Sequence, residues 1–282
     1  LSGEKQMIIA TDLDGTLLSS STKISRENLD SIKRLYENGV HTVIATGRTF
    51  FEIPEELLEC EYIDYIIYSN GAAIYKRGSG VVFSNYIAPD TARGVYRILN
   101  TAQTFIELYV NGIPLVDAKQ FDENGFAYYR IDPAFLPEMR RSRKAVKDPD
   151  SILSHPDLKL EMFDVFFRDM EEREECKRRI RSCFPHLEIT TSMRNNLEIM
   201  NGGINKGTGL LTLCKIAGID LNGVLVIGDS KNDLSLFRAA KHRLAVSNAC
   251  AELKEISDGV ICSNDENIMC CMENLIRKNV VV

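Results

Sequence analysis

The chain has 282 residues, of which 44% are hydrophobic and 26% are charged. This composition is typical of a globular protein with ample material for a buried core, and it excludes disorder as the governing state. The 34 Lys and Arg residues against 40 Asp and Glu residues give a formal net charge of −6, the wrong sign for a protein that binds the nucleic-acid backbone. No apolar run approaches the ~20 residues that cross a membrane, and the apolar stretch at 7–10 is too short for a secretion signal. We therefore expect a soluble cytoplasmic protein without nucleic-acid or membrane partners.

Eight cysteines occur without CxxC pairs or regular intervals, at positions 60, 176, 183, 214, 250, 262, 270 and 271. This pattern argues against both a zinc module and a secreted disulfide scaffold. We expect all eight to be ordinary reduced side chains.

Near-continuous apolar runs at 6–12, 40–46, 64–69 and 224–229 indicate strands that are buried on both faces, and two further strands are expected at 242–247 and 259–262. A helix is expected to begin after the N-cap Ser25 and to end at Gly39, and a second one to run from Lys206 to Ala217 with Gly218 as its stop. Together these elements predict an α/β fold with a doubly wound, Rossmann-like parallel sheet.

The middle of the chain differs from both ends. The segments at 105–110 and 158–167 alternate more, which is typical of an antiparallel sheet with one exposed face. The charge run at 171–182 is interpreted as a solvated helix, and 140–147 as a surface linker or helix. We therefore predict an inserted α/β domain at 86–190, between the two parts of a discontinuous core at 1–85 and 191–282.

Asp12 and Asp14 directly follow the first predicted strand, in the sequence DLDGT. If the chain stays extended, both carboxylates lie on one side of the strand's end, where they need a cation or a shared proton. An Asp-Gly turn that merely closes the strand explains this segment equally well.

Asp229 and Asp233 follow another buried strand, in the sequence GDSKND. A helix that begins at Ser230 or Lys231 would bring both carboxylates to one cation, and oxygen ligands without Cys or His favour Mg²⁺ over zinc. Helix capping is the alternative, and it accounts for one acid but not for the second.

Three weaker signals lie at other element boundaries. Thr46-Gly47-Arg48 follows the second strand, where a helix N-terminus could bind phosphate, although a plain turn is at least as good an explanation. Asn70-Gly71 is a common turn signal. Lys206 opens its helix, where a positive charge is unfavourable unless an anion lies nearby.

Taken together and in this order, the motifs resemble those of the haloacid dehalogenase-like hydrolase superfamily, and of its Cof-type subfamily with an inserted α/β cap of the C2B type. The matching segments are DLDGT at 12–16, ATGR at 45–48, SNGA at 69–72, NKG at 205–207, GDSKND at 228–233 and AVSNA at 245–249. The expected cap, residues 86–190, carries no motif.

The resemblance implies a role for each matching residue. Asp12 would be the nucleophile that forms an aspartyl-phosphate, and Asp14 the general acid and base. The resemblance implies a Mg²⁺ site made by Asp12, Asp14, Asp229 and Asp233, and phosphate binding by Thr46, Gly47, Lys206 and Asn232. Arg48 and Asn70 are weaker candidates for contacts with the substrate or the cap.

The function implied is a Mg²⁺-dependent phosphatase for small phosphorylated metabolites, most plausibly sugar phosphates. Relatives that are ion pumps carry Thr in place of Asp14, so its presence favours hydrolysis. A phosphoryl-transferring mutase and a non-catalytic sensor of a phosphorylated ligand are the alternatives. The aromatic residues of the middle segment could stack on a sugar, but at strand spacing they more often belong to a core; they are Phe105, Tyr109, Phe121, Phe126, Tyr128 and Tyr129.

Overall fold

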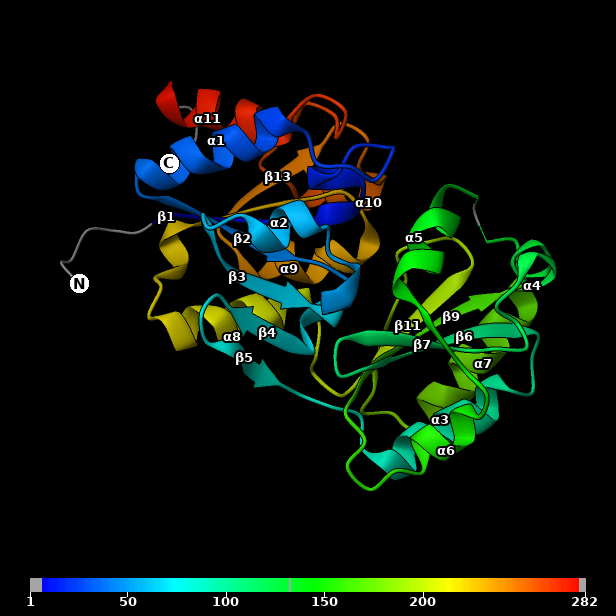
Figure 1. Cartoon of the computed structure of the whole chain (residues 1–282). Coiled ribbons are helices and arrows are strands. Elements are labelled where there is room, and N and C mark those ends of the chain that lie inside the picture. The colour runs from blue at the N-terminus through cyan, green and yellow to red at the C-terminus, as the bar shows by residue number, and fades with distance from the viewer. Residues whose placement is uncertain (1–6, 132, 279–282) are drawn as a thin grey trace. The chain divides into compact units, whose positions relative to one another are not determined.

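The computed structural model describes residues 7–131 and 133–278. The chain forms two compact units (Figure 1). The first contains Leu1–Gly47, Ile53–Phe83 and Asn205–Val282, and the second contains Arg48–Glu52 and Ser84–Ile204. Each unit has its own sheet, so each is described by itself.

The first unit is built on an eight-stranded sheet with the order β14-β13-β12-β1-β2-β3-β4-β5. Its neighbours pair in parallel from β14 to β3, and β4 is antiparallel to β3. The strands are β1 (Met7–Thr11), β2 (Val40–Ala45), β3 (Ile63–Tyr68), β4 (Ala73–Lys76), β5 (Gly80–Ser84), β12 (Val224–Gly228), β13 (His242–Val246) and β14 (Gly259–Ile261). All six predicted strands are present to within about a residue at each end, and Gln6 of the first lies outside the described residues.

Helices cover both faces of this sheet, with α1 and α11 packed together on one face and α8 and α9 together on the other (Figure 1). The helices of the unit are α1 (Arg26–Glu37), α2 (Glu55–Glu59), α8 (Lys206–Ala217), α9 (Leu234–Ala239), α10 (Ala251–Ile256) and α11 (Ile268–Arg277). The predicted caps are present: the Ser25 side chain accepts from the Asn28 N–H, and Gly218 adopts φ 69° after α8. The predicted doubly wound α/β fold is thus confirmed.

The second unit is built on a six-stranded sheet with the order β10-β11-β9-β6-β7-β8, in which only the pair β7–β8 is parallel. Its strands are β6 (Thr104–Val110), β7 (Ile113–Asp117), β8 (Lys144–Val146), β9 (Leu160–Phe167), β10 (Glu188–Thr190) and β11 (Asn196–Met200). Its helices are α3 (Pro89–Leu99), α4 (Glu123–Tyr128), α5 (Leu136–Ser142), α6 (Pro149–Leu153) and α7 (Met170–Cys183). The predicted antiparallel character is confirmed.

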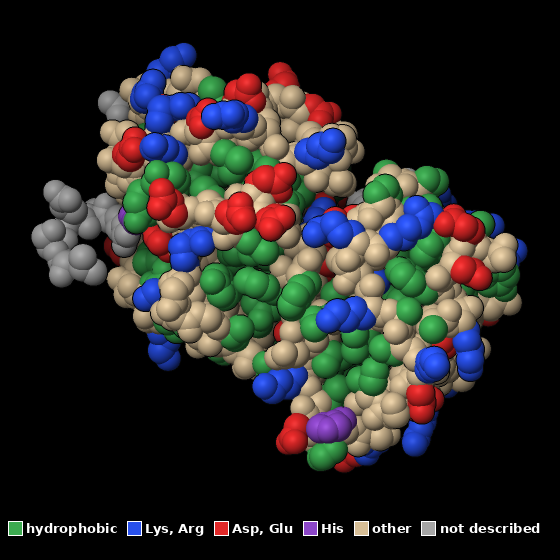
Figure 2. Space-filling view, viewed as in Figure 1, with side chains coloured by type: hydrophobic (Ala, Val, Ile, Leu, Met, Phe, Trp, Pro, Cys, Tyr) green, Lys and Arg blue, Asp and Glu red, His purple; other side chains and the backbone are tan. Residues whose placement is uncertain are grey.

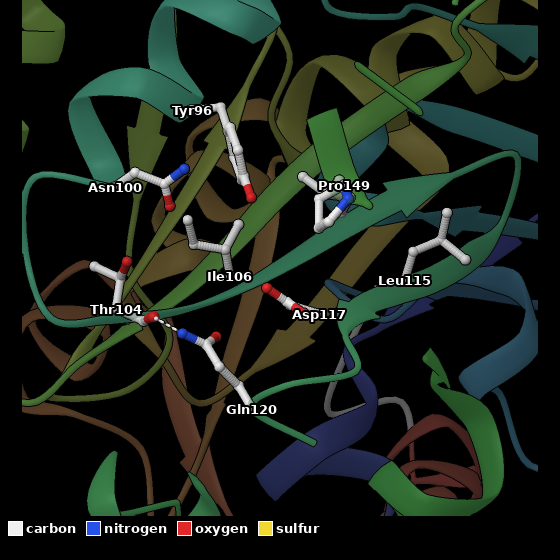
Figure 3. A pocket seen from close by; sticks show the side chains of 9 residues that line it. Tyr96, Asn100, Thr104, Ile106, Leu115, Asp117, Gln120 and Pro149 are labelled. Carbon is white, nitrogen blue, oxygen red and sulfur yellow. Dashed lines mark hydrogen bonds between the residues drawn. The ribbon is translucent and has the colours of Figure 1, made fainter. Parts of the chain in front are cut away.

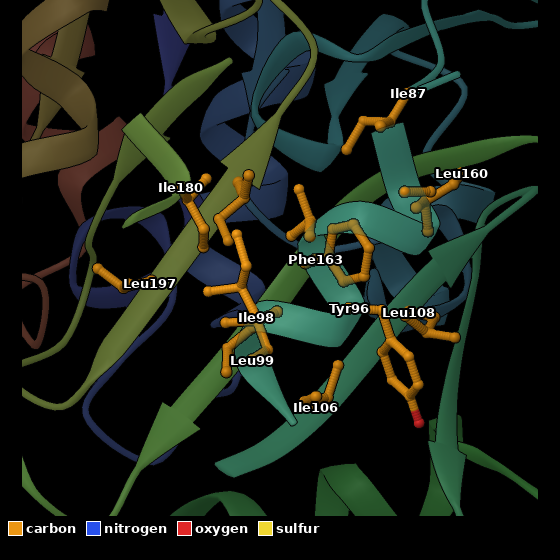
Figure 4. Packing of buried hydrophobic residues seen from close by; sticks show 14 of the residues in the cluster. Ile87, Tyr96, Ile98, Leu99, Ile106, Leu108, Leu160, Phe163, Ile180 and Leu197 are labelled. Carbon is orange, nitrogen blue, oxygen red and sulfur yellow. The ribbon is translucent and has the colours of Figure 1, made fainter. Parts of the chain in front are cut away.

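The expectation that this sheet has one exposed face is wrong, because all eight residues of β9 are buried. One face packs against α3, α6 and α7, and Figure 4 shows Ile98 and Leu99 of α3 beside Ile106 and Phe163 of the sheet. The other face carries a smaller cluster formed with α4 and α5. Phe105, Phe126 and Tyr129 belong to that cluster, so these aromatic residues are core.

The second unit extends beyond the predicted limits of 86–190, because β11 pairs with β9 and β10 and the unit therefore continues to Ile204. The interpretation of 140–147 as a surface linker or helix holds for the exposed residues of the segment but fails at Arg143. The segment contains the end of α5 and the strand β8, and between them the Arg143 side chain is only 8% exposed. Its guanidinium group binds two buried acids, which a charge run on the surface would not do.

The expectation that all cysteines are reduced is corrected at one pair. Cys262, just after β14, and Cys271, in the first turn of α11, form a disulfide. The pair closes a short loop between these two elements, a local pairing that irregular spacing along the chain does not reveal.

Within the described residues, every helix is either too short or too polar to cross a bilayer. On the face shown in Figure 2, Lys and Arg side chains alternate with Asp and Glu side chains, and no large area carries a single sign of charge.

Candidate active site

The Asp12 loop, residues 12–18, follows β1 at the carboxyl end of the parallel sheet. Asp12 is only 3% exposed, and its N–H donates to the carbonyl of Ile227 in β12 at 3.0 Å. Asp14 is partly buried. Gly15 adopts φ 71°, and a Cβ atom there would lie 2.5 Å from Oδ2 of Asp229. The turn can therefore approach the Asp229 carboxylate only because residue 15 has no side chain.

Lys206 is the first residue of α8, and its ammonium group lies among three oxygen acceptors. Nζ donates to Oδ1 of Asp12 at 2.6 Å, to Oδ1 of Asp233 at 2.7 Å and to Oδ1 of Asn232 at 3.3 Å. The side chain is 1% exposed, and the two carboxylates raise its pKa against the opposing effect of burial. The anionic partner expected for this lysine is thus provided by the protein itself.

Asp229 and Asp233 both belong to the Asp229 loop, residues 229–233. Oδ2 of Asp233 accepts from the N–H groups of Asp229 and Ser230, at 3.0 and 3.1 Å. The capping explanation therefore holds for Asp233, which caps this turn while its other oxygen binds Lys206. The carboxylate of Asp229 faces the Asp12 loop instead, where its Oδ1 accepts from the hydroxyl of Thr16 at 3.4 Å.

The carboxylates of Asp12, Asp229 and Asp233 offer oxygen atoms that all lie within 4.8 Å of one another. Burial raises the pKa of Asp12 well above its usual range, and the charges of Asp233, Asp229 and Asp14 raise it further. Burial and the charge of Asp233 raise the pKa of Asp229 to about 7. One lysine faces three carboxylates, so burial and mutual repulsion oppose the ionisation of all three at once.

Thr46, Gly47, Asn70 and Asn232 meet beside Lys206. The N–H of Asn70 donates to the carbonyl of Thr46 at 3.0 Å, and Nδ2 of Asn232 donates to Oδ1 of Asn70 at 3.3 Å. A Cβ at Gly47 would lie 3.3 Å from Oδ1 of Asn70 and 3.6 Å from Nδ2 of Asn232. The ends of β2, β3 and β12 thus place four predicted residues around one point.

Arg48 belongs to the second unit, and its Nη1 donates to the carbonyl of Glu52 at 2.7 Å. Its suggested contact with a substrate stays a prediction.

Residues without a predicted role also hold the site together. Nδ2 of Asn248 donates to the carbonyl of Gly15 at 2.7 Å, and the hydroxyl of Ser230 donates to Oδ1 of Asn232 at 2.7 Å. Asn248 lies in the AVSNA segment at 245–249, whose resemblance to the family implies no role for an individual side chain. Its position in that motif is the sequence signal that could have indicated a role for Asn248 in the site.

The second unit contains a cavity of about 30 Å³ between the sheet, α3 and α6 (Figure 3). It is lined by residues that include Tyr96, Asn100, Asp117 and Gln120. This volume accommodates one or two water molecules. It is too small for a phosphorylated metabolite.

Comparison with known proteins identifies the class to which this fold and site belong. Residues 9–268 match the family model of the haloacid dehalogenase-like hydrolases. The chain therefore belongs to the haloacid dehalogenase-like hydrolase family, as its motifs predict.

Individual relatives are similar over nearly the whole chain. The 5-amino-6-(5-phospho-D-ribitylamino)uracil phosphatase YwtE of Bacillus subtilis is 29% identical, over 92% of this chain and 94% of its own. The structure of a haloacid dehalogenase-like hydrolase from B. subtilis superimposes with a TM-score of 0.84 at 22% identity, covering 96% of this chain and 99% of that one. The subclass IIB sugar phosphatase BT4131 gives a TM-score of 0.80 at 20% identity, covering 98% and 100%.

Proposed function

We propose that the protein is a Mg²⁺-dependent phosphatase that hydrolyses small phosphorylated metabolites, in particular sugar phosphates, through an aspartyl-phosphate on Asp12. The observation that carries the proposal is the buried lysine between Asp12 and Asp233, beside a third carboxylate from Asp229. This arrangement fixes a nucleophilic carboxylate next to a positive charge and leaves negative charge for a cation to balance.

The donor set fits Mg²⁺. It consists of carboxylate oxygens without Cys or His, the hard ligands that this ion prefers. Asp12, Asp229 and the backbone of Asp14 would hold the ion, and Asp233, whose two oxygens already accept hydrogen bonds, would complete or orient that shell. Bound Mg²⁺ would supply charge that offsets the repulsion between these carboxylates and the phosphate oxygens.

The chain's own residues account for the remaining chemistry. Lys206 opposes the rise in the pKa of Asp12 that burial and the neighbouring carboxylates cause. Together with a bound cation it would favour the ionised carboxylate, which could attack phosphorus without a separate base. Asp14 would donate a proton to the leaving oxygen and then accept one from the hydrolytic water. Thr46, Gly47 and Asn232 would hold phosphate oxygens, while Arg48 and Asn70 would contact the rest of the substrate or the cap.

We propose that the second unit is the cap that selects the substrate. The family membership supports a small phosphate ester, and the names of two relatives point toward phosphorylated sugars or polyols: a phospho-ribitylamino compound for YwtE and a sugar phosphate for BT4131. A panel of sugar and polyol phosphates, scored by released phosphate, would identify the preferred ester.

The purified protein should release nitrophenol from an aryl phosphate in the presence of Mg²⁺ and lose this activity when the ion is chelated. Asp12→Asn should lower kcat on the order of 10³-fold or more, because the amide is a poor nucleophile. Asp30→Asn, on the exposed surface of α1, is the matched control and should retain full activity. An unimpaired Asp12→Asn enzyme, or no turnover of either the aryl ester or the panel, contradicts the proposal.

A further inference from the structure

Two loops carry the acids of the candidate site, and a third loop holds both of them. This third loop, the Asn248 loop, contains residues 247–250 between β13 and α10. Its Asn248 side chain donates to the Gly15 carbonyl at 2.7 Å, and its Cys250 N–H donates to the Asp229 carbonyl at 2.8 Å. One short segment therefore binds the backbone of the Asp12 loop and that of the Asp229 loop.

The Asn248 side chain is itself fixed in orientation. Its Oδ1 accepts from the N–H of Asn264 at 3.1 Å, which leaves Nδ2 directed at Gly15. The buried Asn264 side chain in turn donates to the carbonyl of Leu18 at 3.1 Å, at the far end of the Asp12 loop. Two asparagines therefore hold this loop by its carbonyls.

Gly15, whose carbonyl Asn248 binds, lies where the Asp12 loop passes closest to Asp229. Gly15 directly follows Asp14, and a Cβ atom at Gly15 would lie 2.5 Å from Oδ2 of Asp229. With such a close approach, a small shift of the Gly15 peptide changes the position of Asp14 relative to Asp12 and Asp229. Displacements of about 1 Å can cost on the order of 100-fold in rate.

We propose that Asn248 is a positioning residue, which holds the Asp14–Gly15 turn against Asp229 and so sets the direction in which Asp14 delivers its proton. This inference rests on the proposed phosphatase function for its kinetic consequence, but not for its structural one. It assigns a role to the AVSNA segment, which the mechanism above leaves unused.

The kinetic test compares kcat/KM for an aryl phosphate with kcat/KM for an alkyl phosphate. An alkyl oxygen needs a proton as it leaves, whereas a nitrophenolate does not, so a misplaced general acid harms only the alkyl ester strongly. Asn248→Ala should lower kcat/KM about tenfold more for the alkyl than for the aryl ester. An unchanged ratio between the two esters overturns the proposal.

Two further variants make this test specific. Asn248→Asp keeps the size of the side chain but has no N–H to donate, so it should reproduce the defect. Asn38→Ala is the matched control. Asn38 is exposed, lies just beyond the end of α1, and also donates from Nδ2 to a backbone carbonyl, that of Arg34 at 2.7 Å. It should keep the wild-type ratio. Failure of both Asn248 variants to fold would make the residue a structural one and would also overturn the proposal.

Hydrogen–deuterium exchange provides a readout that needs no activity. The amides of Leu17 and Leu18 donate within the Asp12 loop, to the carbonyls of Asp12 and Leu13. They should exchange faster in Asn248→Ala while the amides of β1 are unchanged. If the wild-type protein hydrolyses no ester, the proposed function fails, and exchange alone decides the proposal: unaltered rates in the loop overturn it.

Discussion

Gly15 lies where the backbone of the Asp12 loop passes the carboxylate of Asp229. Its φ of 71° is a conformation that costs an L-residue roughly 1–2 kcal/mol, and a methyl group there would collide with Asp229. Backbone strain and steric collision are two separate costs. Gly39, by contrast, carries only the first.

Gly15→Ala should therefore lose nearly all phosphatase activity, and Gly39→Ala should not. Gly39 has a similar φ of 79°, but nothing lies within 4 Å of its added Cβ. Backbone strain should cost both variants about 1–2 kcal/mol of stability, measured by thermal unfolding, and Gly15→Ala should lose more because of the collision with Asp229. The value of kcat should fall only for Gly15→Ala. Equal activity of the two variants would show that the Asp229 carboxylate does not need this close approach.

Lys206 illustrates how far the sequence could predict the site. Its place at the start of a helix indicated an anionic partner, and the motif order indicated Asp12, Asp229 and Asp233. The sequence could not show that Asp233 divides its two oxygens between Lys206 and a backbone cap. Such sharing depends on the geometry of one turn and not on residue type.

At the scale of elements, α8 was predicted residue for residue because its signals are local: Asn205 caps its start, and Gly218 ends it. Arg143 was misread because its partners are remote in sequence. A run of basic residues has the same sequence whether its members are solvated or buried. The fold brings Glu107 of β6 and Glu52 of the 48–52 segment to Arg143, and the sequence does not show this. The role of Asn248 was missed for the same reason, since Gly15 lies 233 positions away.

Arg143 connects three elements of the second unit. Its guanidinium group binds Glu107 of β6 through two hydrogen bonds of 3.0 Å and Glu52 of the 48–52 segment at 2.5 Å. Both acids are almost completely buried, and burial raises the pKa of Glu107 in spite of the arginine. Without Arg143 these carboxylates would lack a compensating charge.

Arg143→Met should accordingly lower the free energy of unfolding by about 3–5 kcal/mol, the usual cost of breaking a buried ion pair on one side. Arg141→Met is the control, since Arg141 is 52% exposed and pairs with Glu138 within its own helix; it should cost less than about 1 kcal/mol. Urea unfolding of the two variants measures the difference. Coincident unfolding curves would mean that the buried acids are neutral without the arginine.

The sheet of the second unit carries a row of acids that influences the stability of the whole molecule. Asp164 of β9 pairs across the sheet with Glu107 of β6 on one side and with Glu198 of β11 on the other. Burial raises the pKa of Asp164 well above its usual range, and the charges of Glu198 and Glu107 raise it further. The folded protein therefore holds a proton on Asp164 at pH values where the unfolded chain has lost it.

This difference predicts how stability changes with pH. A raised pKa in the folded state stabilises the fold fully below the unfolded pKa of about 4, and this contribution is lost as the pH rises through the folded value. Asp164→Asn does not ionise, so its Tm relative to wild type should increase from pH 4.5 to pH 8, by about 2–4 °C for each kcal/mol. The exposed Asp157→Asn should track wild type. A Tm difference between Asp164→Asn and wild type that stays constant with pH would show that the pKa of Asp164 is not raised in the folded protein.

The chain passes between its two units at four places, after residues 47, 52, 83 and 204. The last two of these places suggest a simple deletion, in which residues 84–204 are removed, the ends are joined and the first unit is kept. The short passage through 48–52 complicates that dissection. Deletion of 84–204 would leave Glu52 without its partner Arg143 and the Phe51 N–H without the Gly112 carbonyl. Both residues lie within a few positions of Thr46 and Gly47. A fragment of 84–204 would in turn lack one of the two acids that neutralise its buried arginine. Residues 48–52 therefore connect the second unit directly to Thr46 and Gly47 of the first. A deletion of the second unit has to redesign 48–52 as well.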